Sequence, residues 1–258
     1  MKFAFVVGSP RSGTTMVGKL LGSSPRIFNP GEYFGFYVAS AIVPSFMIRV
    51  PSSSRDEYLS SLEQHAIAFA EQSALEAGAA VFCDATPWNM RIISRLESLL
   101  SGCVYVLCIR HAAGIVASLA ASRRAGYVWA GENFTDRIAL FVDSYSRVDQ
   151  LPASRTIIFD YDAFCTAPER VLSSFSRSSV HILGGEPSDY DLAVLTQRHA
   201  PNTNSAAPIG VIETNGALRF RPRPSYDLRS FNAEQIKSLD AATADMRSRI
   251  RERLETAT

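Results

Sequence analysis

The sequence has few of the residues that build metal centres or disulfide frameworks. Its 258 residues include four cysteines and four histidines. No C-x-x-C pair occurs, and the histidines lack H-x-x-x-H or H-E-x-x-H spacing, so we predict no metal site. Cys83, Cys103 and Cys108 lie in apolar runs, where reduced thiols behave as core side chains.

Long apolar runs and a strong net charge are also missing. No stretch approaches the length of a membrane span, and the N-terminus lacks the form of a signal peptide. We therefore expect a soluble, cytoplasmic protein with no membrane partner. The formal net charge is +1, so the charge gives no general attraction to nucleic acid. Any anion recognition must be local, and it must rely mainly on arginine because lysine is scarce.

Four short runs rich in Val, Ile, Phe and Cys predict buried parallel strands. They cover residues 3–7, 79–83, 103–109 and 155–159. Helical patterns alternate with them at 14–22, 34–48, 56–77, 90–100, 112–124, 132–149, 168–183 and 233–255. The alternation predicts an α/β fold, a P-loop-like doubly wound parallel sheet of about four to five strands flanked by helices. We expect a single domain over residues 1–258.

The C-terminal part combines a well-marked helix with a long irregular segment. Asn232 can cap the last helix, and Gln235 stands at the reciprocal position of a capping box. The preceding residues 199–230 are rich in Pro, Asn and Ser, and such a long segment is usually a lid or a binding loop. Its basic residues are Arg219, Arg221, Arg223 and Arg229.

The first strand runs directly into the sequence GSPRSGTT at residues 8–15. Glycines let backbone N–H groups approach an anion, and the helix that follows adds its unpaired donors. The glycine spacing has a Walker A outline, but Thr14 stands where a nucleoside triphosphatase carries lysine. Arg11 supplies a cation with a forked donor geometry. The segment therefore predicts an anion-binding loop without the nucleotidase signature.

Residues 9–15, SPRSGTT, resemble the 5'-phosphosulfate loop of sulfotransferases that use 3'-phosphoadenosine-5'-phosphosulfate (PAPS), in the arginine-bearing form of tyrosylprotein and bacterial enzymes. The resemblance implies that PAPS is the donor, that 3'-phosphoadenosine 5'-phosphate (PAP) is the product, and that no metal takes part. It assigns the 5'-phosphosulfate to residues of this loop: Arg11, Ser12, Gly13, Thr14 and Thr15.

A second segment resembles the 3'-phosphate site of the same family. Arg110 follows the strand at 103–109, and Ser118 comes eight positions later on the next helix. In the family an arginine and a serine so placed hold the phosphate that distinguishes PAPS from simpler nucleotides. Arg123 continues this helix and is expected to add charge. Tyr161 follows the strand at 155–159 and is expected either near the nucleotide or in the core.

Glu32 is the expected catalytic base. It follows the first helix, and its distance in sequence from Arg11 matches the spacing between loop and catalytic glutamate in the tyrosylprotein enzymes. The alternative is that Glu32 only favours the N-terminus of the helix predicted at 34–48. His111 is the competing base because it adjoins Arg110 at a strand end.

One position departs from the family pattern. The segment at 83–89 resembles a family stretch with lysine before a Thr-Pro pair, and Ala85 occupies the lysine position. In relatives this lysine helps to stabilise the transferring group, so either Arg11 and the 199–230 segment supply the charge or the protein is slow or inactive. The neighbouring Asp84 is a further acid or base candidate, unless it caps a helix or pairs with an arginine.

Aromatic residues are expected to bind the acceptor, a small aromatic or apolar molecule with a hydroxyl group. Several of them are equally suited to the core. The set comprises Phe28, Tyr33, Phe34, Phe36, Tyr37, Phe46, Trp88, Tyr127, Trp129 and Phe134.

The leading hypothesis is a PAPS-dependent sulfotransferase that acts on a small metabolite. A catalytically impaired homologue that binds PAP or PAPS is the first alternative, because Ala85 replaces the family lysine. A P-loop kinase of small substrates is the second, and the missing Walker lysine counts against it.

Overall fold

Five parallel strands form the central sheet of the computed structural model, which describes the chain except for residues 48–50, 191–210, 213–217, 220–230 and 257–258. The strands are β1 (Lys2–Gly8), β2 (Ile27–Phe28), β3 (Val81–Asp84), β4 (Val104–Ile109) and β5 (Thr156–Asp160). Their order is β2-β3-β1-β4-β5. The predicted fold class is confirmed. The prediction missed β2, because two residues are too short to produce a periodic pattern.

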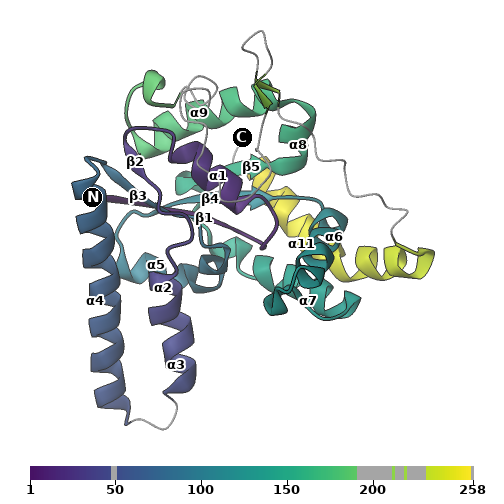
Figure 1. Ribbon diagram of the computed structural model, residues 1–258, viewed down its shortest axis with the longest axis horizontal. Coiled ribbons are helices and arrows are strands. Elements are labelled where there is room, and N and C mark those ends of the chain that lie inside the picture. The colour runs from purple at the N-terminus through teal and green to yellow at the C-terminus, as the bar shows by residue number, and fades with distance from the viewer. Residues whose placement is uncertain (48–50, 191–210, 213–217, 220–230, 257–258) are drawn as a thin grey trace.

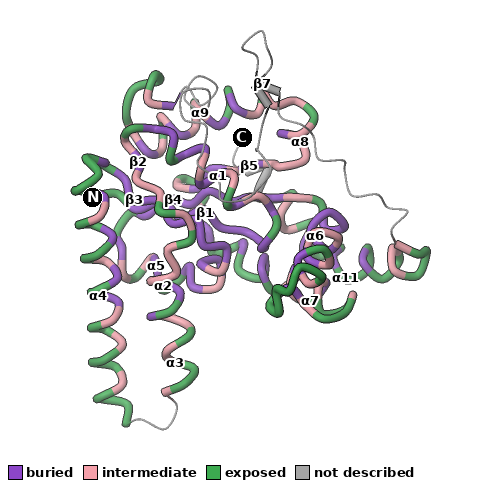
Figure 2. The backbone as a smooth tube through the Cα atoms, in the orientation of Figure 1, coloured by how far each residue is buried: buried purple, intermediate pink, exposed green. Residues whose placement is uncertain are grey.

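Helices cover both faces of this sheet (Figure 1). One face packs against α1 (Thr14–Leu21), α8 (Tyr161–Thr166) and α9 (Pro168–Leu183). The other packs against α2 (Gly35–Tyr37), α4 (Ser52–Glu76), α5 (Ile93–Leu99), α6 (Ala112–Arg124), α7 (Phe134–Tyr145) and α11 (Ala233–Thr256). Figure 2 shows the strands buried and the outer helices exposed along one side. Within the described residues, no helix has both the length and the apolar character needed to cross a bilayer.

The helix predicted over residues 34–48 is divided in the structure. It consists of α2, a π-helical segment (Val38–Ile42) and α3 (Val43–Phe46). Pro44 has no backbone N–H and cannot donate to the carbonyl four residues earlier, so a regular α-helix cannot continue through it. Together with the distal part of α4, α3 extends away from the sheet (Figure 1).

Most of the C-terminal expectations can be compared with the structure. The capping box of α11 is present, since Asn232 Oδ1 accepts from Gln235 N at 2.8 Å and Gln235 Oε1 accepts from Asn232 N at 3.0 Å. The proposed lid at 199–230 lies outside the described residues except for two short antiparallel strands, β6 (Val211–Ile212) and β7 (Leu218–Arg219).

The sheet changes winding direction at β1. The chain moves from β1 to β2 and β3 on one side, then crosses to β4 and β5 on the other. As a result, α1 and α6 leave the neighbouring carboxyl ends of β1 and β4 toward opposite faces. Ligands of open α/β sheets bind at such a switch point. The predicted anion loop and Arg110 both lie there.

Phe82 and Phe46 provide a matched test of where the core lies. Phe82 is fully buried on β3 among Phe3, Phe28 and Tyr33, whereas Phe46 is 83% exposed on α3. We expect Phe82→Ala to lower the free energy of unfolding by about 3–5 kcal/mol and Phe46→Ala to change it by less than about 0.5 kcal/mol. Denaturant titration measures both values, and equal losses would contradict this assignment of the core.

Candidate functional site

The turn after β1 has backbone conformations that leave room for an anion. Gly8 lies opposite Cys108 of β4 with φ 145°, and a Cβ there would stand 2.5 Å from the Cys108 carbonyl oxygen. Ser12 N donates to Ser9 O at 3.0 Å and closes the turn. Arg11 has φ 74°, in the left-handed region that non-glycine residues rarely adopt. Strain of this kind gathers at functional sites because the surrounding structure imposes it.

The N-terminus of α1 has neither a side-chain cap nor an acidic residue of its own. Its N-cap residue, Gly13, offers no side-chain hydrogen bond, and the first turn contains no acidic residue. The first backbone N–H groups of a helix have no partners within the helix, and they lie at the positive end of its dipole. Thr14 is buried and Thr15 is exposed at this end. The helix start therefore suits a phosphate or sulfate group.

Contacts between β1, β4 and β5 bring the predicted 5' and 3' residues together. Arg11 Nε donates to Ser118 Oγ at 3.0 Å, and Arg110 Nη1 donates to the Arg11 carbonyl oxygen at 2.9 Å. The Arg110 guanidinium lies over the Tyr161 ring, 4.5 Å from its centroid. A Cβ at Gly13 would stand 2.7 Å from Tyr161 Cδ2. Two arginines, a serine and a tyrosine therefore form one continuous cluster beside the turn.

Glu32 belongs to a segment that is hydrogen-bonded to the end of β3. Asn29 Nδ2 donates to Cys83 O at 2.8 Å, and Ala85 N donates to Gly31 O at 2.9 Å. On the other side of Glu32, Phe34 N donates to Thr86 Oγ1 at 3.0 Å. These bonds hold the backbone before and after Glu32. The carboxylate lies near the anion loop, since it forms a hydrogen bond with Thr15 and interacts electrostatically with Arg11.

The environment of Glu32 favours a proton acceptor that is stronger than an ordinary glutamate. The surrounding protein raises the pKa of Glu32 by desolvation, and the nearby Asp84 carboxyl raises it further. Arg11 and the hydrogen bond from Thr15 oppose this rise in pKa. Glu32 is nevertheless exposed to solvent. Glu32 is thus a reachable carboxylate next to the principal cation of the loop.

Asp84 has a structural position behind this segment. It is fully buried, and its Oδ1 accepts from Tyr33 N at 3.1 Å and from Thr86 N at 2.9 Å. Its Oδ2 accepts from Asn89 Nδ2 at 2.7 Å. Burial raises the pKa of Asp84, while these hydrogen bonds oppose the rise. Of the roles considered from the sequence, these contacts match capping of the turn at residues 86–89.

His111 and Arg123 each have a partner within the protein. His111 is the N-cap of α6, where its Nδ1 accepts from Ala113 N at 3.2 Å. Its backbone N–H donates to Asp162 Oδ2 at 2.6 Å. Arg123 lies further along α6 and forms an ion pair with Glu132 at 3.2 Å. No contact among the described residues joins Arg123 to the cluster of Arg11, Arg110 and Ser118.

The ten aromatic residues proposed for the acceptor divide into two groups. Phe36 and Tyr37 are buried, and Phe28, Tyr33, Phe34 and Phe134 pack against the same core. Trp88 also packs against this core, whereas Phe46, Tyr127 and Trp129 are exposed. Trp88, Trp129 and Tyr127 form a series of ring contacts that starts at the buried Tyr37. Trp88 stacks on Tyr37, Trp129 meets Trp88 edge-on with centroids 6.1 Å apart, and Tyr127 tilts against Trp129.

Ala85 is buried between β3 and α1. A Cβ at Gly18 would stand 2.6 Å from Ala85 Cβ, and Asn29 packs against the same glycine. The small side chains at positions 18 and 85 therefore let α1 lie directly over the end of β3.

The sequence reasoning missed three polar residues that hold the segment around Glu32 and Asp84, namely Asn29, Thr86 and Asn89. The sequence Asn29-Pro30-Gly31 is typical of a turn, and this was the available signal.

Comparisons with known proteins agree with this geometry. A family model described as the sulfotransferase family matches residues 4–175. Three solved structures have a similar fold. The sulfotransferase domain of the Synechococcus PCC 7002 olefin synthase has a TM-score of 0.60 and 15% identity, and the match covers 95% of this chain and 94% of that chain. The sulfotransferase domain of the curacin biosynthetic pathway has a TM-score of 0.57 and 16% identity, with 94% of this chain and 97% of that chain covered. Sulfotransferase STF9 from Mycobacterium avium has a TM-score of 0.55 and 10% identity, with 95% of this chain and 76% of that chain covered. A search of curated proteins by sequence found no match.

The raised pKa of Glu32 makes a testable prediction about stability. The folded state binds a proton at the Glu32 carboxylate more readily than the unfolded chain does. The free energy of unfolding therefore falls as the pH rises from 4.5, the ordinary pKa of glutamate, through the raised pKa of Glu32. We therefore expect Glu32→Gln to unfold at a higher temperature than the wild type at neutral pH, and the difference to vanish below pH 4.5.

The matched control is Glu71→Gln on an exposed face of α4. Thermal unfolding at several pH values measures both variants. A Glu32→Gln protein that is less stable than the wild type at neutral pH would show that the carboxylate holds the segment together instead of being strained within it.

Proposed function

The chain belongs to the sulfotransferase family, and from this premise we propose that it transfers a sulfonate from PAPS to a hydroxyl group of a small aromatic or apolar metabolite. The observation that carries the proposal is the contact between Arg11 and Ser118, which joins the anion loop to α6 at the switch point of the sheet. A donor with phosphate groups at both the 5' and 3' positions requires two neighbouring anion sites. This contact supports the proposal because it brings the residues assigned to the two sites next to each other.

The 5' end of the donor is assigned to the loop and the start of α1. Backbone N–H groups and Arg11 would bind the sulfonate and the 5'-phosphate, because both are anions and charge-assisted hydrogen bonds are the strong ones. The 3'-phosphate is assigned to Arg110 and Ser118. Arg110 Nε is buried and has no hydrogen-bond acceptor among the described residues. Buried donors are rarely left unpaired, so this one suits a ligand oxygen.

The reaction needs a base for the acceptor and positive charge for the leaving group. As the acceptor oxygen bonds to sulfur, the bond from sulfur to the 5'-phosphate oxygen breaks and the phosphate takes the electron pair. Glu32 is assigned to remove the acceptor proton, since its carboxylate lies near Arg11 and Thr15 and has a raised pKa. Arg11 and the N–H groups of α1 would stabilise the charge that develops on the phosphate. In the described residues, no group of His, Cys, Asp or Glu is arranged to hold a metal ion.

The acceptor is assigned to the aromatic series of Trp88, Trp129 and Tyr127, of which Trp88 is half-buried and the other two are exposed. Trp88 lies in the turn at residues 86–89, two residues after Thr86. Thr86 Oγ1 accepts from Phe34 N, so this turn is tied to the segment that carries Glu32. Trp88 and Trp129 present flat apolar surfaces, and Tyr127 adds a polar tip. Two of the similar structures come from an olefin synthase and from a biosynthetic pathway, which supports a metabolite as acceptor.

Titration calorimetry with PAP, ADP and ATP, each with and without Mg²⁺, tests the nucleotide assignment. We expect magnesium-independent binding of PAP in preference to ADP. Arg110→Ala should weaken PAP binding by about 10- to 100-fold, since it removes charge-assisted hydrogen bonds to the 3'-phosphate. Arg124→Ala, on an exposed part of the same helix, is the matched control. A preference for ATP with Mg²⁺ would instead support a kinase.

The assignment of Glu32 is tested by turnover with labelled PAPS and a panel of phenols and alcohols. We expect Glu32→Gln to bind PAP as the wild type does and to lose about 10²–10⁴-fold in turnover, as removal of a general base does. Because the carboxylate must be ionised to accept a proton, wild-type turnover should rise with pH through a pKa above the ordinary glutamate range. Equal damage to PAP affinity and turnover would refute its role as base.

Ala85 keeps one second candidate open, a homologue that binds the nucleotide with little catalysis. Such a protein would bind PAP with the selectivity described above but would transfer no sulfonate to any member of the panel. The two experiments therefore separate loss of the nucleotide site from loss of the chemistry.

A further inference from the structure

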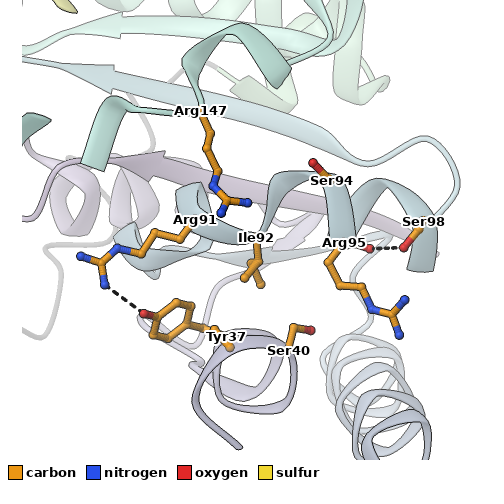
Figure 3. Close-up of a pocket in the computed structure, with 9 residues that line it drawn as sticks. Tyr37, Ser40, Arg91, Ile92, Ser94, Arg95, Ser98 and Arg147 are labelled. Atoms are coloured by element: carbon orange, nitrogen blue, oxygen red, sulfur yellow. Dashed lines mark hydrogen bonds between the residues drawn. The ribbon is translucent and has the colours of Figure 1, made fainter. Parts of the chain in front are cut away.

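A second basic pocket lies away from the anion loop. It has a volume of about 510 Å³ and opens between the π-helical segment after α2 on one side and α5 on the other (Figure 3). It shares no residue with the cluster of Arg11, Arg110 and Ser118. The pocket is an open groove, and its volume leaves room for a small organic molecule.

The lining of this pocket is polar and positively charged. It comprises three arginines, three serines and three residues with apolar surface, and it contains no carboxylate. These residues are Tyr37, Ser40, Ala41, Arg91, Ile92, Ser94, Arg95, Ser98 and Arg147. Arginine carries five N–H donors, so a guanidinium that already has one partner can still bind another acceptor.

Two of the three arginines are fixed by protein carboxylates. Arg95 forms a forked ion pair with the buried Glu63, including a bond of 2.8 Å from Nε. Arg91 forms an ion pair with Asp143, and its Nη1 also donates to the Tyr37 hydroxyl at 3.1 Å. These contacts hold both guanidinium groups in place without removing all of their donors. Arg91 Nε is buried and has no acceptor among the described residues.

Arg147 supplies charge that no carboxylate offsets in the described part of the chain. Its side chain takes part in none of the hydrogen bonds or ion pairs found there, and Figure 3 shows the guanidinium directed from the segment that follows α7 toward Arg91 and Ile92. Ala41 and the small exposed parts of the mostly buried Ile92 and Tyr37 supply the apolar part of the lining. The combination is suited to a molecule with an anionic group and a short apolar body.

We propose that this pocket is a second anion site, and that it binds a small organic anion such as an aryl carboxylate, phosphate or sulfate ester. The anionic group lies against Arg147 and Arg91, and the apolar body lies over Ile92 and Tyr37. The Tyr37 ring stacks on Trp88, and the Arg91 guanidinium lies 4.5 Å from the Trp88 ring centroid. The pocket therefore adjoins the aromatic series without using the nucleotide residues, and its existence does not depend on the proposed function.

Calorimetric titration at low ionic strength, with phenyl phosphate as the probe, tests this proposal. Low salt is needed because exposed charges are screened. The protein is first saturated with PAP, so that the anion loop is occupied. We expect phenyl phosphate to bind more tightly than inorganic phosphate and benzyl alcohol, since only the first satisfies both the arginines and the apolar surface. Arg147→Gln should weaken its binding by about tenfold or more.

Arg177→Gln, an exposed arginine on α9, is the matched control and should leave the affinity unchanged. Equal affinity of the Arg147→Gln and Arg177→Gln proteins would overturn the proposal, and so would a failure of phenyl phosphate to bind. Inorganic phosphate binding as tightly as phenyl phosphate would overturn the assignment of an organic ligand. If PAP itself does not bind, Arg11→Gln replaces PAP as the means of disabling the loop. The PAP titration then tests the proposed function, and the phenyl phosphate titration tests the pocket separately.

Discussion

The pairing of β1 with β4 is the constraint on which the candidate site depends. Gly8 lies opposite Cys108, and only a residue without a side chain fits this close to the Cys108 carbonyl. The same carbonyl accepts a hydrogen bond from the buried Tyr145 hydroxyl at 2.8 Å, which ties α7 to this point. Since Arg11 follows β1 and Arg110 follows β4, the register of the two strands sets the distance between their side chains. A shift by one residue would also turn each strand's side chains to the opposite face.

A second set of contacts fixes the proposed base independently of that pairing. The segment carrying Glu32 has no long helix or strand of its own, and its position follows from hydrogen bonds to the end of β3. Asp84 is central to them, because one buried carboxylate accepts from both Tyr33 N and Thr86 N. This explains how a carboxylate can be fully buried while it also acts on Glu32 through its charge. The cost of burying Asp84 is offset by three hydrogen bonds, and the result is a Glu32 held between a negative and a positive neighbour.

Much of the fold could be predicted from the sequence because its elements are long and periodic. The bounds of α6 and α9 match the expected 112–124 and 168–183, and the capping box of α11 follows from two residues in the right positions. The missed features depend on contacts between distant segments. The pairing of β2, the hydrogen bond from Asn29 to β3 and the ion pair of Arg123 with Glu132 leave no local pattern. The family resemblance indicated which residues belong to the site, but the left-handed conformation of Arg11 emerged only from the folded chain.

The packing around Ala85 bears on how the chemistry proceeds without the family lysine. Position 85 faces Gly18 and Asn29, so a side chain larger than alanine would have to run along α1 to reach the loop. Arg11 is the one cation whose charge lowers the pKa of Glu32 within the described residues. Arg11 also donates to Ser118, and its backbone carbonyl accepts from Arg110. These two hydrogen bonds and the attraction to Glu32 together set the position of Arg11. A strained backbone costs about 1–3 kcal/mol, and here it places one guanidinium between Glu32, the anion loop and Ser118. A sulfonate carries less charge than a phosphoryl group, so in the proposed reaction Arg11 and the N–H groups of α1 are the candidates to take the place of the lysine.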